Sequence, residues 1–337
     1  MSVPGERLET SNRPVIIVGC PRSGTTLLQL MLHAHPRIAI PPENRFVLPA
    51  YHQRHRFGDL RSAANRRGLA EWLVSDRSTK FRDFGLDPAA VIERIVAAPP
   101  TLGSALAAVF RAYADRFGKP RWGDKRPSYL TNLGIIERLF PTAQIVHIVR
   151  DGRDCVASLK GMPWHRTGFY HAVAMWAKSI DHARWAARRR APDSFYELQY
   201  ERLVTDPVGE LTALCAYLGE EYHSAMAEPA TLASTVVPRR KKHHALTRAP
   251  VTDARVGSWA DRLEPWEISL CEAVLGDRLR RYGYELSGAA RPPVAMRLRY
   301  ERVALRPRLS VPRQALTRVY HRLLPQAPLA AQAPDSG

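Results

Sequence analysis

The stretch VGCPRSGTTLLQLML, Val18 to Leu32, decides the fold that this sequence predicts. It begins inside PVIIVG, residues 14–19, a β-branched run ending in glycine that is typical of a buried parallel strand. The apolar spacing over residues 24–35, closed by Pro36, predicts a helix directly after the turn. A strand, a glycine-bearing turn and a helix together form a cradle for an anion.

The turn departs from the nucleotide-binding pattern G-x-x-x-x-G-K-[ST] at one position. Gly19, Gly24 and Thr26 fit the pattern, but Thr25 stands where the lysine is expected. A triphosphate with magnesium normally requires that lysine. A sulfuryl group spreads one negative charge over three oxygens, whereas a terminal phosphoryl group carries nearly two, so the missing lysine favours sulfate transfer without a metal.

The other polar groups of the loop suit an anion. Arg22, Ser23, Thr25 and Thr26 supply a guanidinium and three hydroxyls, and charge-assisted bonds of this kind contribute roughly 1.5–3 kcal/mol each. Gly24 lets the backbone approach a ligand closely. The alternative is that the stretch is only a turn and N-cap, where serine and threonine are favoured anyway.

Beyond the loop, strand and helix patterns alternate. Further strands are predicted over 144–149 and 194–200, and helices over 60–74, 87–97, 102–117, 128–140, 169–190 and 206–219, with another beginning in RDGRDCVASL. The alternation predicts an α/β fold with a P-loop-like parallel sheet flanked by helices, helical insertions and a basic C-terminal tail. We expect an N-terminal tail over 1–13, one domain over 14–290, and an Arg/Pro-rich extension over 291–337 whose last dozen residues are disordered.

The chain is strongly basic, with 50 Lys and Arg against 32 Asp and Glu and a net charge of +18. Residues 291–322 hold nine arginines and one acid, so eight of these surplus charges belong to the extension. The four cysteines are scattered without metal-binding spacing. No apolar run approaches the ~18 residues of a membrane span, and we expect a soluble, cytoplasmic, reduced protein.

Five motifs occur in one order along residues 14–284: PRSGTT, LMLHAHPRIAIPPENR, GDKRP, HIVRDGRDCVASL and YERLVTDP. In this order and spacing the sequence resembles the sulfotransferase family that uses 3′-phosphoadenosine 5′-phosphosulfate (PAPS), particularly bacterial members and the protein-tyrosine sulfotransferases. The resemblance implies that Arg22, Ser23, Gly24, Thr25 and Thr26 hold the 5′-phosphosulfate. It also implies the product adenosine 3′,5′-bisphosphate and no required metal.

The resemblance assigns Arg150 and Ser158 to the 3′-phosphate of PAPS. Arg150 follows the strand over 144–149, at the strand end where ligands bind in open α/β sheets. For Arg153 and Asp154 we favour a solvated charge cluster at the start of a helix. Tyr200 matches a family tyrosine near the donor, although packing is the usual role of an aromatic at a strand end.

Transfer to a hydroxyl needs a base. Glu43, twenty-one residues after Arg22, matches the proposed catalytic glutamate of the protein-tyrosine sulfotransferases, although the acid that precedes it in the family is Pro42 here. Lys125 matches a family lysine that steadies charge at the leaving oxygen together with Arg22. The alternative is a surface lysine paired with Asp124.

Histidines are rival bases because they titrate near neutrality. They are His33, His35, His147, His165 and His171; we expect His35 to end a helix, His147 to lie in the core, and His165 and His171 to be weak candidates for the acceptor site. Arg255, before a Gly-x-Trp element, is the candidate for closing the 3′-phosphate site, with the basic run 239–242 as its alternative.

Two rival functions remain open from the residues. One is an NTP-dependent phosphotransferase with an atypical loop, and the other is a non-catalytic basic protein that binds nucleic acid or membranes. The arginines from 297 to 308 alternate with apolar residues, compatible with an amphipathic helix interrupted by Pro307. Such a helix contacts acidic membranes weakly or packs on the domain, and the sequence leaves both alternatives open. We see no specific nucleic-acid module. The hydroxyl acceptor, whether small molecule, sugar, lipid or tyrosyl peptide, is not readable.

Overall fold

A five-stranded parallel sheet forms the centre of the computed structural model, which describes residues 12–163, 165–230, 250–309 and 328–332. The strands are β1 (Val15–Gly19), β2 (Ile38–Ala39), β3 (Arg121–Lys125), β4 (Gln144–Val149) and β5 (Phe195–Gln199). Their order in the sheet is β2-β3-β1-β4-β5, and every pairing is parallel. The predicted α/β class with a P-loop-like sheet is confirmed.

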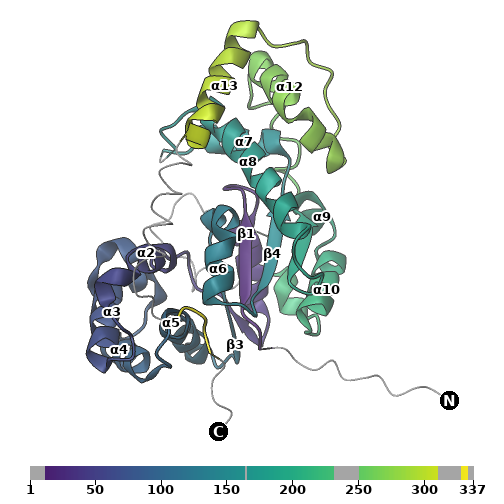
Figure 1. Cartoon of the computed structure of the whole chain (residues 1–337). Helices are drawn as coiled ribbons and strands as arrows, with labels where there is room; N and C mark the ends of the chain where they lie inside the picture. Colours follow the sequence, from purple (N-terminus) through teal and green to yellow (C-terminus); the bar gives the residue numbers. More distant parts are fainter. Residues whose placement is uncertain (1–11, 164, 231–249, 310–327, 333–337) are drawn as a thin grey trace, which may run out of the picture.

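Helices surround this sheet on both faces and beyond its ends (Figure 1). The longer ones are α1 (Thr25–Ala34), α3 (Ala63–Ser75), α4 (Pro88–Ala97), α5 (Leu102–Arg116), α7 (Gly152–Lys160), α8 (Phe169–Ala187), α10 (Pro207–Leu218), α12 (Pro265–Arg281) and α13 (Val294–Leu309). Shorter helices are α2 (Val47–His52), α6 (Leu133–Leu139) and α9 (Tyr200–Thr205). The short 3-10 turns include η4 (Pro127–Asn132). Among the described residues, no helix is long and apolar enough to cross a membrane.

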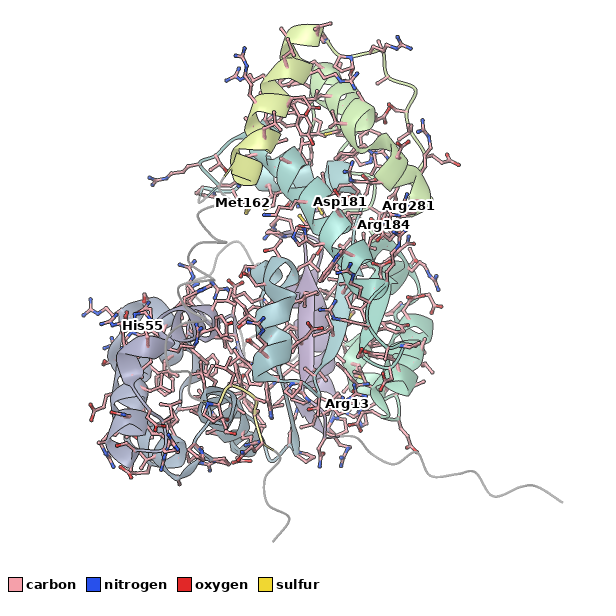
Figure 2. All side chains as sticks on the ribbon, in the orientation of Figure 1. Arg13, His55, Met162, Asp181, Arg184 and Arg281 are labelled. Carbon is pink, nitrogen blue, oxygen red and sulfur yellow. The ribbon has the colours of Figure 1, made fainter. Side chains whose placement is uncertain are left out.

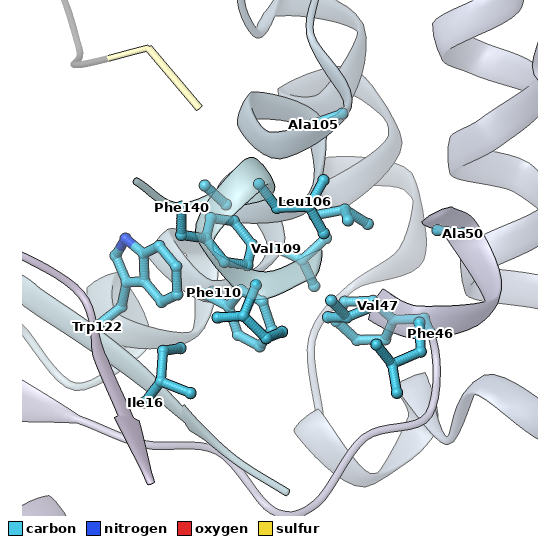
Figure 3. Packing of buried hydrophobic residues seen from close by; sticks show 14 of the residues in the cluster. Ile16, Phe46, Val47, Ala50, Ala105, Leu106, Val109, Phe110, Trp122 and Phe140 are labelled. Atoms are coloured by element: carbon cyan, nitrogen blue, oxygen red, sulfur yellow. The ribbon is translucent and has the colours of Figure 1, made fainter. Parts of the chain in front are cut away.

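Aromatic residues build the core between the sheet and the layer of α2 to α5. Phe110 of α5 stacks on Trp122 of β3, with ring centroids 4.9 Å apart and planes at 7°. Phe46 and Phe140 pack against the same Phe110 ring (Figure 3). This packing fixes β3 against α5, and it so places Lys125, the last residue of β3, at the carboxyl ends of the strands.

Strand β3 is absent from the sequence prediction. Its sequence, RWGDK, contains three charged residues and a glycine, yet all five residues are buried. Arg121 is satisfied in the interior by Glu220 at 3.0 Å, by a bond to Gln144, and by the carbonyl of Leu218. The residues that pair with Arg121 come from distant parts of the chain. The strand itself therefore shows no run of apolar residues, and the search for apolar periodicity did not find it.

Other predicted elements differ in detail. The single helix over residues 128–140 is wrong, because η4 and α6 divide that stretch. The expected interruption at Pro307 is wrong too, since α13 continues to Leu309.

Residues 328–332, near the C-terminus, lie against the start of α5 and the end of α6. Residues Pro328 and Leu329 accept hydrogen bonds from the first two backbone N–H groups of α5, at 3.1 and 2.8 Å. Ala331 donates to the carbonyl of Leu139 at 2.7 Å. For residues 328–332 the structure therefore differs from the predicted disorder of the last dozen residues. Figure 2 shows Arg13 at the amino edge of the sheet, far from Met162 and Asp181, which lie beyond its carboxyl edge.

Candidate functional site

The predicted site residues gather at the carboxyl ends of four neighbouring strands. The loop of residues 20–24 follows β1, and Lys125 is the last residue of β3. Arg150 comes directly after β4, and Tyr200 directly after β5. Because carboxyl ends of parallel strands meet at one edge, residues from distant parts of the chain share one site there.

The loop after β1 is held in a strained conformation. Arg22 has φ of 75°, a left-handed conformation that non-glycine residues rarely adopt, and Gly24 has φ of 98° as the N-cap of α1. A Cβ on Gly24 would come within 2.5 Å of the Tyr200 ring. Ser23 is fully buried, and its Oγ has no hydrogen-bond partner among the described residues. A buried hydroxyl without a partner fits a ligand oxygen.

Arg150 connects three parts of the site. Its Nη1 donates to the carbonyl of Arg22 at 3.2 Å, and its guanidinium carbon lies 4.5 Å from the centroid of the Tyr200 ring. Arg22 in turn donates from Nε to Ser158 Oγ at 2.9 Å. The structure therefore brings together Arg22, Arg150 and Ser158, which the resemblance assigned to two separate phosphates of the donor, and it places the Tyr200 ring against Arg150.

Positive charge is concentrated around Arg22. Burial lowers the pKa of its guanidinium, and the nearby charges of Arg150, Arg262 and Arg255 lower it further. Four arginines whose charges repel one another form a site that is complementary to an anion. Arg262 was missed by sequence reasoning, because a single arginine near a Gly-x-Trp element carries no pattern of its own.

Glu43 and Lys125 form a second group beside the loop. Lys125 Nζ lies 3.4 Å from Glu43 Oε2 and 3.3 Å from Thr26 Oγ1. The Lys125 side chain is 3% exposed, while that of Glu43 is 31% exposed, so the carboxylate is the member that reaches solvent. Lys125 is buried, so the alternative of a surface lysine is wrong.

The neighbours of this pair hold it in place. Asn44 donates to both carboxylate oxygens of Asp124 at 2.8 Å, and Tyr129 Oη donates to Asp124 Oδ2 at 2.6 Å. Asn44 follows Glu43 in the chain, and Asp124 precedes Lys125. One buried hydrogen-bond network therefore fixes the backbone next to Glu43 and the backbone next to Lys125. The sequence did not predict this network, because its members are far apart in the chain.

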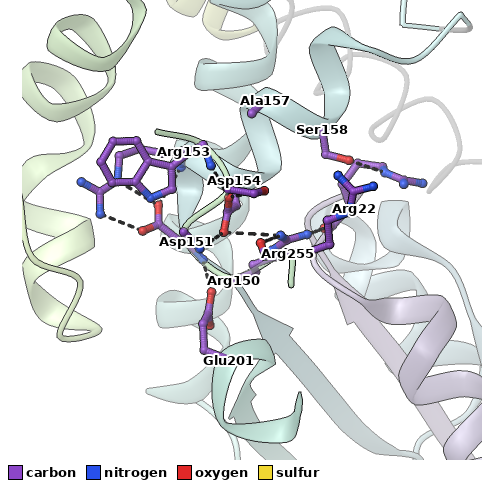
Figure 4. A network of polar contacts seen from close by, with 12 residues as sticks. Arg22, Arg150, Asp151, Arg153, Asp154, Ala157, Ser158, Glu201 and Arg255 are labelled. Carbon is purple, nitrogen blue, oxygen red and sulfur yellow. Dashed lines mark hydrogen bonds and ion pairs between the residues drawn. The ribbon is translucent and has the colours of Figure 1, made fainter. Parts of the chain in front are cut away.

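The charge cluster at the start of α7 is buried, which corrects the expectation of a solvated cluster. Arg153 is 2% exposed and Asp154 is fully buried. Arg153 pairs with Asp151 at 2.8 Å and with Glu272 at 2.7 Å. Asp154 binds Arg150 and the loop around residue 258 (Figure 4). Arg153 and Asp154 therefore hold neighbouring parts of the site in place through buried ion pairs and hydrogen bonds.

Arg255 is exposed, and its backbone carbonyl accepts a hydrogen bond from Arg150 Nη2. The alternative basic run, residues 239–242, lies outside the described residues. His35 caps the end of α1 as expected. His33 and His147 are buried, while the rings of His165 and His171 lie 6.0 Å apart. No group of three or more metal-binding side chains occurs within the described ranges.

Comparisons with known proteins find relatives of this chain among sulfotransferases. A model of the sulfotransferase family matches residues 14–224. Protein-tyrosine sulfotransferase 1 of Danio rerio is 27% identical to this chain over 298 residues, which cover 83% of this chain and 76% of that protein.

Solved structures agree on the fold. The sulfotransferase domain from the Synechococcus PCC 7002 olefin synthase aligns with a TM-score of 0.55 and 24% identity, covering 84% of this chain and all of that domain. The sulfotransferase domain from the curacin biosynthetic pathway aligns with a TM-score of 0.52 and 19% identity, covering 82% of this chain and all of that domain.

Proposed function

This chain belongs to the sulfotransferase family and is a PAPS-dependent sulfotransferase, and from that premise we propose that Glu43 is the general base that activates an acceptor hydroxyl. The observation that carries the proposal is the contact of Glu43 with Lys125, which also reaches Thr26 of the anion loop. A base must lie within reach of the reacting hydroxyl, and Glu43 is the partly exposed member of this group.

The residues of the site suit the donor. Ser23 Oγ, which has no partner among the described residues, and the cluster of Arg22 with three further arginines match phosphate and sulfate oxygens. Arg22, Ser23, Gly24, Thr25 and Thr26 would hold the 5′-phosphosulfate. Arg150 and Ser158 would hold the 3′-phosphate, with Arg255 and Tyr200 alongside.

The chemistry divides among the residues as follows. Bound PAPS supplies an activated sulfuryl group, whose sulfur–oxygen bond to the 5′-phosphate breaks as the acceptor oxygen bonds to sulfur. The Glu43 carboxylate takes the acceptor's proton. Lys125 and Arg22 stabilise negative charge on the departing phosphate oxygen, an effect worth several kcal/mol in a site shielded from water. The products are a sulfate ester and adenosine 3′,5′-bisphosphate, and the proposal requires no metal.

The acceptor is a hydroxyl compound. The relatives named protein-tyrosine sulfotransferases make a tyrosyl hydroxyl the first acceptor to test, before sugars, lipids and small molecules. A panel of acceptors with labelled PAPS would identify it by transfer of label. Transfer to none of these hydroxyl classes would contradict the proposed acceptor chemistry.

Calorimetry tests the donor site. The protein should bind adenosine 3′,5′-bisphosphate far more tightly than ATP with magnesium, and Arg150→Ala should weaken that binding by at least about tenfold, because a charge-assisted bond is lost. Arg67→Ala, which removes an exposed arginine paired with Glu93, is the matched control and should bind normally. Preference for magnesium ATP would favour the phosphotransferase instead.

A further inference from the structure

Asp154 sits one helical turn after Arg150 and binds the loop before α12. Its Oδ2 accepts from the backbone N–H of Gly257 at 3.0 Å. Its Oδ1 accepts from the Ser258 hydroxyl at 3.1 Å and from the backbone N–H of Trp259 at 2.8 Å. Asp154 Oδ2 also lies 3.4 Å from Arg150 Nη2. One fully buried carboxylate thus joins the loop to a phosphate-binding arginine.

Arg153 holds the same loop from its other side. Its guanidinium carbon lies 3.9 Å from the centroid of the Trp259 ring. The guanidinium is itself fixed by Asp151 and Glu272, so it is a rigid platform for the ring. Residues 257–259 are therefore attached to α7 through both backbone bonds and a stacked side chain.

The attached loop carries two arginines of the positive cluster. Arg255 precedes Gly257 by two residues, and its carbonyl is bound by Arg150. Arg262 follows Trp259 by three residues and donates from Nη2 to the carbonyl of Ala157 in α7 at 3.0 Å. The charges of both reach Arg22. Without an anchor, mutual repulsion would drive these arginines apart.

We propose that Asp154 is a positioning residue for the donor's 3′-phosphate, because it ties residues 257–259 to α7 and so holds Arg255 and Arg262 beside Arg150. The inference rests on the proposed donor site. It predicts that Asp154 governs discrimination between nucleotides with and without a 3′-phosphate and has little influence on the 5′ end, where the loop after β1 lies.

The test compares two nucleotides by calorimetry, adenosine 3′,5′-bisphosphate and AMP, which lacks the 3′-phosphate. Asp154→Ala should weaken bisphosphate binding by on the order of tenfold or more while changing AMP binding less than about threefold. Ser258→Ala removes only one of the loop bonds and should reduce the preference by a smaller factor. Asp277→Ala, an exposed acid on α12, is the control and should keep the wild-type preference.

The outcomes are distinct. Equal weakening of both nucleotides by Asp154→Ala would overturn the inference and make Asp154 a general stability residue. If Asp154→Ala does not fold, an unchanged preference in Ser258→Ala overturns it instead. Failure of the wild-type protein to bind the bisphosphate would contradict the donor site itself and not the role of Asp154 alone.

A second, independent observation concerns α13, which packs against α8 at one end of the molecule (Figure 1). Tyr300 is buried on the inner face of the helix. Val294, Leu298 and Leu305 are 74%, 55% and 44% exposed. Their spacing of four and seven residues places them on one outward face, because a helix turns through 3.6 residues.

Exposed arginines flank this apolar row, which we call the outer α13 stripe (Val294, Leu298 and Leu305). Arg297 and Arg302 lie on its two sides, and the exposed Glu301 lies next to the stripe on the side of Arg297, so these neighbours carry a net positive charge. The net positive charge of this face is complementary to lipid phosphates. We infer that the outer α13 stripe docks onto an anionic phospholipid surface, with its apolar residues at the acyl boundary.

Vesicle sedimentation tests this inference with the full chain. The protein should bind phosphatidylglycerol vesicles more strongly than phosphatidylcholine vesicles, and added salt should weaken the binding. Leu298→Asp with Leu305→Asp should reduce it at least about tenfold. Val208→Asp, at an apolar position 52% exposed on α10, is the matched control and should bind normally. Absent binding, binding that survives the double substitution, or a dimer that the substitution dissociates would each overturn the inference.

Discussion

At the scale of single residues, Glu43 combines a carboxylate with two properties that suit a general base. Its side chain is partly exposed, and it contacts the buried Lys125. Glu43→Gln should lower kcat by about 10²- to 10⁴-fold, because the amide cannot take a proton. Binding of adenosine 3′,5′-bisphosphate should be almost unchanged, since the substitution leaves the phosphate contacts intact.

Initial rates with a saturating acceptor and calorimetry on the same samples would check this. Glu93→Gln, at an exposed glutamate of α4, is the control. A wild-type kcat in Glu43→Gln would show that Glu43 is not the general base. His165 and His171 would then be the next candidates for that role.

His33 should make the fold sensitive to acid. Burial lowers its pKa to about 3 from the ordinary 6.5, with a smaller contribution from Lys119. Its Nδ1 accepts from the backbone N–H of Ile40 at 3.0 Å, so the neutral ring is the form that fits. Below pH 6.5 the unfolded chain takes up a proton that the folded chain refuses until about pH 3. The free energy of unfolding should therefore decrease as the pH is lowered from 6.5 towards 3, by up to about 1.4 kcal/mol per pH unit.

His33→Asn should flatten that part of the pH dependence, because asparagine has no charge to gain. Urea unfolding at several pH values would measure it against His55→Asn, a substitution at an exposed histidine (Figure 2). An unchanged slope in His33→Asn would show that other groups cause the acid sensitivity.

The sequence located the residues of the loop after β1, Arg150 and Ser158, because short motifs mark them. It could not locate Asn44 and Asp124, whose hydrogen bond joins residues eighty positions apart. It misjudged Asp154, because acids at a helix start are usually solvated, whereas here the loop before α12 covers the carboxylate. Such burial is a property of the fold that local patterns do not encode.

At the scale of elements, the turn into α1 depends on Gly24. Its φ of 98° is unfavourable for other residues, and a Cβ would meet the Tyr200 ring at 2.5 Å. Gly24→Ala should weaken donor binding by more than tenfold, because the loop must move away from Tyr200. Gly168→Ala is the matched control, since Gly168 has φ of 82° but no atom within 4 Å of the added Cβ.

Both variants should lose stability from backbone strain, but only Gly24→Ala should lose affinity for adenosine 3′,5′-bisphosphate. Thermal unfolding and calorimetry separate the two effects. Equal affinities in the two variants would mean that the fit between Gly24 and Tyr200 does not shape the donor site.

The sequence predicted best those elements whose apolar pattern is unbroken. β1, β4, α4 and α5 were found within a residue or two, whereas β2 with two residues and the charged β3 were not. β3 carries Lys125, so the missed strand is also the one that explains why Lys125 reaches the loop after β1. Tertiary pairing of Arg121 with Glu220, and not local propensity, makes β3 a buried strand.

At the scale of the whole molecule, the C-terminal segment joins the start of α5 to the end of α6. Residues 328–332 supply partners for the backbone N–H groups of Leu102 and Gly103, which no helix bond can satisfy at the start of α5. Leu329 and Ala331 also pack against the core. The extension is thus joined to the domain at a point more than two hundred residues away in the sequence.

A thermodynamic cycle should detect this joining. Removing residues 328–337 should lower the free energy of unfolding by about 1–3 kcal/mol, because four hydrogen bonds are lost while five residues no longer need ordering. Gly103→Ala should displace the same segment, since an added Cβ would come within 2.4 Å of the Ala331 nitrogen and 2.6 Å of the Leu329 carbonyl oxygen. The two changes together should therefore cost less than their sum, by about 1 kcal/mol. Strictly additive free energies would contradict this coupling. The cost of Gly103→Ala would then arise from contacts outside the segment, such as the carbonyl oxygen of Leu139, 2.3 Å from the added Cβ.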